Sequence, residues 1–393
     1  MTSEVDAKFL RENLRGFVDN ELEPAAGKID RTDRIPDEIW QKMRDMRLFS
    51  LTLPKEQGGV GLKWTDYFFV LEELSRTGGF ARVIVHQING LSYNMISKYG
   101  NEAQKERFLS LMAKGEFLFA FGVTEPDRGT GADMGTTATK KGDKYVLNGQ
   151  KHLITLANVS DATVVFAVTD ETRRKSGGIT AFIVEPMFST IATPNERRFN
   201  LPAGLEMENL PLCMGSRGLY EGWLTFTDCE IPASAVLGKE GQGLDIALDV
   251  LDESRASIAA SCLGLGQKMM ELAVERAKQR VTFGKPIAER QAIQQMIAEM
   301  ATDIQALRLM VYDVAEKFDA GIDIKTEASM AKLFGLSALR NVSDKALEIF
   351  GGIGYSSKFP IERMYRDARS LWLEEGTPTI QKLVICRDIL KRY

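Results

Sequence analysis

Cysteine is scarce in this chain of 393 residues, which holds only Cys213, Cys229, Cys262 and Cys386. They are widely spaced, and no two of them form the C-x-x-C pattern typical of zinc sites and redox centres. This spacing does not predict a disulfide framework, and it fits a reducing compartment. The material for a stable fold is instead apolar, since 44% of the residues are hydrophobic.

Histidine is scarcer still, because only His86 and His152 occur. Two histidines exclude a multi-histidine metal site, and we expect no bound metal. They also disfavour a Ser-His-Asp hydrolase, whose G-x-S-x-G nucleophile turn is missing.

Long runs of apolar residues, or of charges of one sign, are also missing. No stretch reaches the roughly 18 apolar residues of a membrane-spanning helix, and the acidic N-terminus lacks an apolar signal core. Lysine and arginine number 50 against 54 aspartates and glutamates, which gives a net charge of −4. This balance argues against nucleic-acid and membrane-surface partners. We expect a soluble cytoplasmic protein.

Glycine pairs occur, but not in nucleotide-binding contexts. The G-x-G sequences at 264–266 and 352–354 follow helical patterns rather than strands, unlike a dinucleotide fingerprint. The sequence Gly284-Lys285-Pro286 lacks the upstream glycine and the hydroxyl residue of a phosphate loop. Nicotinamide-dependent and ATP-dependent enzymes are therefore poorly supported.

The pattern of apolar residues changes twice along the chain. Residues 1–116 have helical spacing, and the segment 80–98 is apolar around most of its circumference, so we expect it to be buried. Residues 117–232 hold short β-rich runs separated by turn signals such as Asn148-Gly149, which indicates an antiparallel barrel or sandwich. Residues 233–393 return to long helices with short connections, typical of an antiparallel bundle. The predicted fold is mostly α-helical with a central β domain.

One carboxylate lies in a setting suited to general-base catalysis. Thr377 and Pro378 are typical of the N-cap and first position of a helix, and the segment 361–373 before them also has a helical pattern. Glu375 therefore lies in a short bend, next to Gly376, which leaves room for close approach. Such a carboxylate can act as a base if a substrate lies against it and water is excluded. The alternative is an ordinary solvated glutamate.

A series of motifs resembles the flavin-dependent acyl-CoA dehydrogenases from nearly one end of the chain to the other. In chain order they are FGVTEP at 121–126, NGQKHLIT at 148–155, MGSRG at 214–218, RVTFGKPI at 280–287, FGGIGY at 350–355, RDA at 366–368 and EGT at 375–377. Each motif alone is weak, but their shared order makes the resemblance specific. It implies an N-terminal helical domain (1–116), a middle antiparallel β-barrel (117–232) and a C-terminal four-helix bundle (233–393).

The resemblance implies FAD as the cofactor. Middle-region residues would border the flavin ring and its phosphates: Phe121, Val123, Thr124, Thr130, Leu153 and Thr155. Helical-region residues would reach the FAD of a neighbouring subunit or complete such a site: Arg280, Thr282, Phe283, Gln291, Glu348, Gly351, Gly352, Thr377 and Gln381. A homotetramer or a dimer is therefore implied, with electron-transfer flavoprotein as the electron acceptor.

The resemblance also makes Glu375 the base that removes the α-proton of an acyl-CoA, while the β-hydride passes to flavin N5 and a trans-2-enoyl-CoA forms. In the family, the backbone N–H of the base residue and a ribityl hydroxyl of FAD bind the thioester oxygen. Some members carry the base on the long helix instead, where this chain has Ser254; Glu253 points about 100° away on a helix. Residues implied near the substrate or the base are Asp252, Arg255 and Gly376.

Some positions depart from the family pattern. Glu374 replaces an aromatic residue beside the base, and Leu153 replaces a tryptophan beside the flavin, which leaves the electron acceptor open. Arg82 lies where glutaryl-CoA dehydrogenases hold an arginine for the distal carboxylate of the substrate. A buried arginine needs a counter-charge, although a snorkelling arginine near a helix start is the alternative. Straight-chain, dicarboxylic and cyclic acyl groups stay open.

Three alternative functions stay open as well. An enoyl-CoA reductase would run the reaction backwards, and an acyl-CoA oxidase would pass the electrons to oxygen. A catalytically silent CoA-binding homologue would retain the fold without the chemistry.

Overall fold

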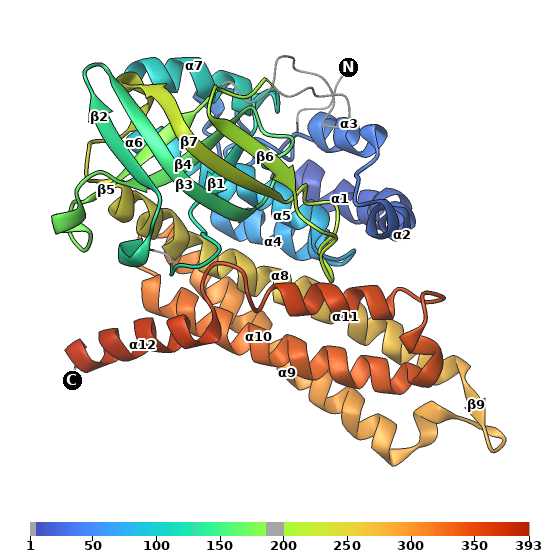
Figure 1. Ribbon diagram of the computed structural model, residues 1–393. Coiled ribbons are helices and arrows are strands. Elements are labelled where there is room, and N and C mark those ends of the chain that lie inside the picture. Colours follow the sequence, from blue (N-terminus) through green and yellow to red (C-terminus); the bar gives the residue numbers. More distant parts are fainter. Residues whose placement is uncertain (1–4, 130, 186–199, 393) are drawn as a thin grey trace.

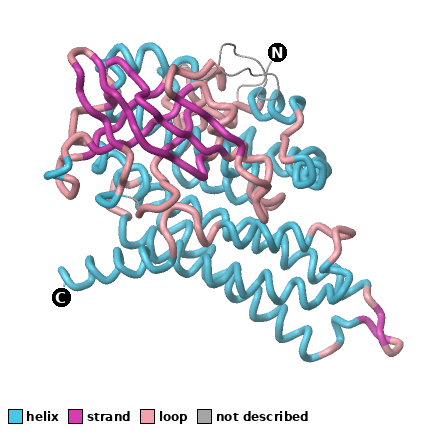
Figure 2. Tube along the Cα trace, viewed as in Figure 1, coloured by secondary structure: helices cyan, strands magenta, loops and turns pink. Residues whose placement is uncertain are grey.

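The computed structural model describes residues 5–129, 131–185 and 200–392. Figure 1 shows a β-rich body packed on one side of a long helical bundle, with the N-terminal helices beside the β-rich body. Figure 2 shows the strands gathered in that one body, apart from a short hairpin at the far end of the bundle. The expectation of a mostly helical fold with a central β domain is confirmed.

Helices make up the N-terminal region. They are α1 (Ala7–Phe17), α2 (Glu23–Thr32), α3 (Asp37–Asp45), α4 (Trp64–Ser75), α5 (Phe80–His86), α6 (Tyr93–Tyr99) and α7 (Glu102–Ala113). A π-helical turn at Gln87–Ser92 joins α5 to α6. Every residue of α5 is buried, as the apolar pattern at 80–98 predicted. Helix α7 was not predicted, although Asn101 and Gln104 form the capping box that signals its start.

The middle region forms one eight-stranded sheet. Its strands are β1 (Phe119–Gly122), β2 (Thr137–Lys141), β3 (Lys144–Ile154), β4 (Ala162–Val168), β5 (Ile179–Val184), β6 (Leu205–Asn209), β7 (Gly222–Pro232) and β8 (Val236–Leu237). The order is β6-β7-β3-β2-β4-β5-β8, with β1 paired to β4. Most pairs are antiparallel, but β1 and β2 each meet β4 in parallel.

The Asn148-Gly149 turn signal does not end a strand. Strand β3 runs on to Ile154, and the register to β7 shifts between Leu147 and Gly149. Gly149 has φ +139°, and a Cβ there would lie 2.6 Å from the Cα of Thr136. The glycine therefore permits an irregularity within β3 and a close approach to the segment that holds Thr136.

The C-terminal region is a bundle of long helices. They are α8 (Gly243–Gln279), α9 (Gln291–Asp319), α10 (Lys325–Phe350), α11 (Ile361–Ser370) and α12 (Pro378–Arg392). A hairpin of β9 (Val281–Thr282) and β10 (Lys285–Pro286) joins α8 to α9. Helix α8 also packs against α4, where a Cβ on Gly264 would lie 1.9 Å from the carbonyl oxygen of Glu72. This contact seats the bundle against the N-terminal helices. None of the helices in the described ranges is both long enough and apolar enough to span a bilayer.

Candidate active site

The bend around Glu375 connects two helices, as predicted. Helix α11 ends at Ser370 and α12 begins at Pro378. Within the bend, Glu375 has φ +51° and Gly376 has φ +91°. A left-handed conformation is uncommon for a residue with a side chain and costs of order 1 kcal/mol or more, so other contacts must stabilise it.

Lys332 of α10 provides those contacts. Its Nζ donates to three successive carbonyl oxygens, at 2.7 Å to Glu374, 2.9 Å to Glu375 and 2.9 Å to Gly376. The lysine is fully buried, and burial lowers its pKa to about 8, although Glu375 and Glu374 act in the opposite direction. A protonated amine has three N–H donors, so each carbonyl of the bend receives one.

The carboxylate of Glu375 is held by side chains from other helices. Ser254 of α8 donates its hydroxyl to Glu375 Oε2. The same hydroxyl contacts Nε2 of His86, whose Nδ1 lies 3.0 Å from the hydroxyl of Tyr67. Ser254 occupies the position that the family resemblance gave as the alternative for the base, and its hydroxyl binds Glu375, the predicted base. Glu253 points elsewhere, as helical spacing predicted, and binds Asn94.

The imidazole of His86 is uncharged in this arrangement. It lies 3.6 Å from Glu375 Oε1. Burial, with a further contribution from Arg82, lowers the pKa of His86 to about 3. The contact between His86 and Glu375 is therefore not an ion pair at neutral pH. From the sequence, this histidine served only in arguments against metal sites and a Ser-His-Asp hydrolase, and no local pattern pointed to its contact with α8.

Arg82 is buried and has a counter-charge within the chain. Only 1% of its surface is exposed, and both terminal nitrogens lie 3.0 Å from Glu374 Oε2. The other oxygen of Glu374 accepts a hydrogen bond from Ser370 at 3.1 Å. Glu374, which replaces the aromatic residue of the family pattern, is thus the partner of Arg82 and meets the arginine's need for a counter-charge.

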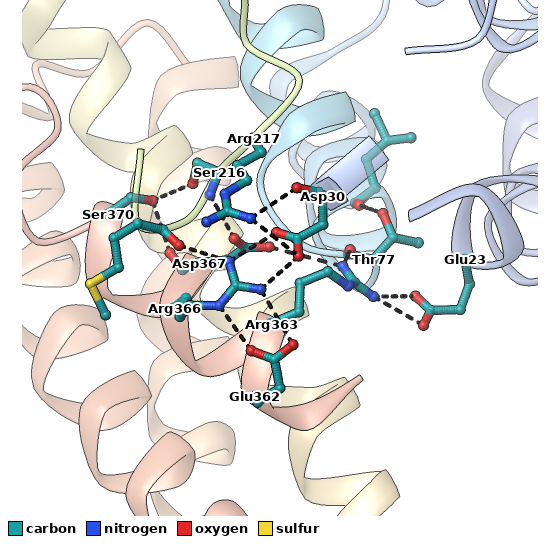
Figure 3. Close-up of polar contacts among 12 residues, drawn as sticks. Glu23, Asp30, Thr77, Ser216, Arg217, Glu362, Arg363, Arg366, Asp367 and Ser370 are labelled. Carbon is teal, nitrogen blue, oxygen red and sulfur yellow. Dashed lines mark hydrogen bonds and ion pairs between the residues drawn. The ribbon is translucent and has the colours of Figure 1, made fainter. Parts of the chain in front are cut away.

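A polar network fixes α11, the helix that leads into the bend (Figure 3). Arg366 binds both carboxylate oxygens of Asp30 in α2, at 2.9 and 2.7 Å. Asp367 accepts the backbone N–H of Ser216 at 2.6 Å, and the hydroxyl of Ser216 contacts Ser370. The network therefore connects the helix that precedes Glu375 to the N-terminal helices and to the loop before β7.

The middle-region residues with implied flavin roles lie on adjoining segments. Phe121 is in β1, with Val123 and Thr124 directly after it, while Leu153 and Thr155 lie at the end of β3. The two segments meet where a backbone N–H from β3 donates to the Thr124 carbonyl at 3.0 Å. Leu153 is 53% exposed and has φ +52°. Thr130 lies outside the described residues.

A buried ion pair lies next to these two segments, between Lys151 of β3 and Glu125 after β1. Lys151 is fully buried, and its Nζ lies 2.8 Å from Glu125 Oε1. The carboxylate also accepts the backbone N–H groups of Gly135 and Thr136, at 2.5 and 2.9 Å. Burial lowers the pKa of Lys151 to about 8, although Glu125 acts in the opposite direction. Because an unpaired buried charge is costly, this pair fixes the segment after β1.

Glu221 is a site residue that sequence reasoning missed. Its Oε1 accepts the Thr155 hydroxyl at 2.9 Å, and its Oε2 is buried without a hydrogen-bond partner in the described chain. Burial raises the pKa of Glu221 to about 7, despite the hydrogen bond from Thr155. The residue precedes β7 directly, and its position next to a β-rich run carried no signal of this contact.

The remaining implied flavin residues lie at the far end of the bundle, which we call the hairpin tip (residues 280–291 and 351–355). It holds Arg280, Thr282, Phe283, Gln291, Gly351 and Gly352, with Glu348 exposed one turn before it. Phe283 is 98% exposed. Figure 1 shows β9 well separated from the β-rich body. The structure therefore divides the implied flavin residues into two groups within one chain.

Four more predicted residues lie close to the bend or to α8. Gln381 is buried and donates to the Gly376 carbonyl at 2.9 Å, while Thr377 is exposed. Asp252 pairs with Arg255 one turn along α8 and with Lys325 at 2.9 Å. Arg255 is buried.

These surfaces fit a flavin nucleotide. The middle-region surface combines an exposed apolar side chain, Leu153, with the Thr155 hydroxyl. Beside the bend, Gln381 Oε1 is buried and accepts no hydrogen bond from any described residue. A planar apolar ring with polar edges matches such a mixture. Across residues 5–129, 131–185 and 200–392, no three His, Cys, Asp or Glu side chains gather in a way that suits a metal ion.

Comparison with known proteins assigns the whole chain to one group. Profiles of the N-terminal, middle and C-terminal domains of acyl-CoA dehydrogenases match residues 4–116, 120–229 and 241–390. The chain is 36% identical to a short-chain-specific acyl-CoA dehydrogenase of Clostridium acetobutylicum, over 98% of both chains. It is 37% identical to a 3-(aryl)acrylate reductase of Clostridium sporogenes, again over 98% of both. A structure of glutaryl-CoA dehydrogenase with glutaryl-CoA aligns at a TM-score of 0.89 and 33% identity, covering 98% of this chain and 95% of the other.

Proposed function

This chain belongs to the acyl-CoA dehydrogenase family and is an oxidoreductase, and from that premise we propose that it removes hydrogen from the α and β carbons of an acyl-CoA thioester. Glu375 takes the α-proton, and a trans-2-enoyl-CoA is the product. The proposal rests on the placement of this carboxylate in a bend whose backbone carbonyls are bound by buried Lys332. A base fixed in this way meets the substrate in one orientation, as proton abstraction requires.

The backbone of the same bend suits the developing negative charge on the thioester oxygen. No acceptor among the described residues binds the backbone N–H of Glu375. This N–H is therefore free to donate to the substrate oxygen, and such a donor contributes about 3 kcal/mol to the transition state. Base and oxyanion donor would then come from a single residue, which fixes their relative position.

FAD, when bound, supplies the acceptor for the β-hydride. Phe121, Val123, Thr124, Leu153 and Thr155 are the proposed contacts to its ring, with Thr377 and Gln381 beside the bend. We assign the hairpin tip and Glu348 to the FAD of a second subunit in a homotetramer or dimer. Electron-transfer flavoprotein is the proposed electron acceptor.

The reverse reaction is the second candidate function. It is favoured by the similarity to the 3-(aryl)acrylate reductase of Clostridium sporogenes, which matches this chain as well as the dehydrogenases do. Glu375 would then deliver the proton to the α-carbon of an enoyl thioester. The same residues serve both directions, so the acceptor and donor supplied to the enzyme must separate them.

An anaerobic spectral titration of the FAD-loaded protein tests this function. We expect the oxidised flavin band to bleach with one of butyryl-CoA, glutaryl-CoA or a cyclic acyl-CoA, and Glu375→Gln to abolish bleaching while retaining FAD. If no acyl-CoA bleaches the oxidised flavin but an enoyl-CoA reoxidises the chemically reduced flavin, the enzyme is a reductase. Rapid reoxidation by oxygen would identify an oxidase. Failure to bind FAD, or equal bleaching by Glu375→Gln, would contradict the proposal.

The same titration examines Arg82 as a substrate contact. Because Glu374 already binds this arginine, a substrate carboxylate must compete with it. A preference for glutaryl-CoA that Arg82→Met removes would assign the arginine to the distal carboxylate. If the wild type and Arg82→Met both prefer butyryl-CoA to the same degree, Arg82 serves as the partner of Glu374 and does not bind substrate.

A further inference from the structure

Three buried polar side chains form a line that ends on the proposed base. Tyr67 comes from α4, His86 from α5 and Ser254 from α8, and at most 2% of any of them is exposed. Tyr67 contacts His86 Nδ1, His86 Nε2 contacts Ser254 Oγ, and Ser254 Oγ contacts Glu375 Oε2. Buried polar groups are costly unless they are satisfied, so a line built from three separate helices indicates a purpose.

The direction of the hydrogen bonds follows from the chemistry of the groups. Burial raises the pKa of Tyr67 well above its usual value of 10, so the phenol keeps its proton. Neutral His86 has a single N–H, and its Nδ1 can accept from Tyr67 only if that proton is on Nε2. Nε2–H then donates to Ser254 Oγ, which leaves the serine proton for the carboxylate. Each group donates to the next, and the last acceptor is Glu375 Oε2.

The two oxygens of the base are therefore not equivalent. Oε2 accepts the serine hydroxyl proton, whereas Oε1 accepts no hydrogen bond from the part of the chain that is described and lies 3.6 Å from His86 Nε2. A hydrogen bond also fixes the rotation of the carboxylate about its last torsion, which is otherwise broad. The free oxygen is thus held in one place.

We propose that Ser254 and His86 are positioning residues that hold Glu375 by Oε2 and leave Oε1 to take the substrate α-proton. Tyr67 fixes the tautomer and orientation of His86 in the same way that outer-shell groups orient catalytic histidines elsewhere. The inference rests on the proposed function, because it takes Glu375 to be the base. It adds residues that do not touch the substrate or the flavin but decide where the base points.

Exchange of the α-hydrogen in D2O tests the inference without an electron acceptor. The FAD-loaded enzyme is incubated anaerobically with an acyl-CoA that it binds, and deuterium incorporation is followed by NMR. We expect Ser254→Ala to slow exchange by roughly 10-fold to 100-fold, as for the loss of one hydrogen bond to a charged group. Its dissociation constant for the acyl-CoA should be unchanged, and Ser254→Thr, which keeps the hydroxyl, should retain most of the rate.

Ser257→Ala is the matched control. Ser257 lies one turn along α8, is equally buried, and its hydroxyl has no hydrogen-bond partner in the described chain. It should exchange like the wild type. Wild-type exchange by Ser254→Ala, or an equal loss in Ser257→Ala, would overturn the inference. If the wild type exchanges no hydrogen at all, or if Glu375→Gln exchanges normally, the proposed function fails instead.

A second pair of variants tests His86 independently of Ser254. Gln places an amide N–H close to the position of the imidazole Nε2, so His86→Gln should keep most of the exchange rate. His86→Leu fills the space without a donor and should lose as much as Ser254→Ala. Combining His86→Leu with Ser254→Ala should add little, because both act through the same hydrogen bonds. Additive losses would show that the histidine acts separately from the serine.

Discussion

The bend around Glu375 and the hairpin tip belong to the same helical bundle. They differ in how many of their groups find a partner within the chain. In the bend, Lys332 binds three carbonyls and Glu374 binds Arg82. At the hairpin tip, Phe283 is 98% exposed and Tyr355 is 85% exposed. The chain itself supplies these partners in the bend, whereas it leaves these two aromatic side chains of the tip exposed.

This difference indicates two ways of building a site. A carboxylate that acts as a base, as we propose for Glu375, needs a fixed position, and buried charges and backbone contacts provide it. An exposed aromatic residue on a left-handed bend, as at Phe283 with φ +51°, is poorly explained by the stability of a single chain. Exposed apolar clusters commonly mark interaction sites. The predictions below test each half of the comparison.

The largest effect is expected at Lys332. Lys332→Met leaves three carbonyls of the bend without donors, and each such loss costs about 1–3 kcal/mol. We expect the free energy of unfolding to fall by about 3 kcal/mol and kcat to fall about 100-fold, because a small displacement of a reacting group has that effect. Thermal unfolding and anaerobic reduction kinetics measure the two.

Lys345→Met is the matched control on the same helix. Lys345 pairs with Glu299 at 3.1 Å at the surface, where such pairs contribute at most about 1 kcal/mol. It should change neither quantity appreciably. Equal behaviour of the two lysine variants would break the view that the bend is held by its own chain.

Local pattern was enough to predict where the bend lies, but not what holds it. The helix start at Pro378 follows from residue types that favour helix N-termini, and α12 begins there. Lys332 could not be recognised in this way, because it is an ordinary-looking residue of a helical pattern and meets the bend only after α10 and α12 pack together. Arg82 and Glu374 were each noticed as unusual, yet 292 residues separate them, and nothing local pairs them.

The sheet shows the same limit. Asn148-Gly149 is typical of a turn, but the pairing of β3 with β7 continues past it. The two residues form an irregularity in the strand instead of ending it. Nothing in the sequence indicated the contact that His86 makes, because its partner is a serine 168 residues away. Residue types and spacing therefore predicted the three regions and most of their elements, although helix α7 was missed. The contacts between elements required the structure.

A smaller effect is expected from pH, through the same lysine. Burial lowers the pKa of Lys332 to about 8 from its usual 10.5, so the ammonium loses a proton as the pH rises through 8. A neutral amine has two N–H donors rather than three, and one carbonyl of the bend loses its hydrogen bond. We expect kcat to decline several-fold between pH 7 and pH 9.

Loss of folding does not account for this decline. Between pH 8 and about 10.5 the unfolded chain binds more protons at this lysine than the folded chain, so this group's contribution to stability rises with pH. Lys332→Arg stays charged throughout the range, and its lower activity should be independent of pH there. A wild-type profile that is flat to pH 9 would contradict the prediction.

The smallest effect on stability, and the sharpest test of the other half of the comparison, is expected at the hairpin tip. Phe283→Ser removes a side chain that the single chain barely contacts, so thermal unfolding of the apo chain should shift by less than about 0.5 kcal/mol. If the tip serves a second subunit, the same change should weaken the oligomer and FAD retention together. Leu390→Ser, which alters another exposed apolar residue at 74% exposure, should leave FAD retention unchanged. Sedimentation velocity and flavin content are measured on the same samples. A Phe283→Ser protein with the wild-type oligomeric state and full flavin content would show that the tip does not bind a second subunit or its FAD.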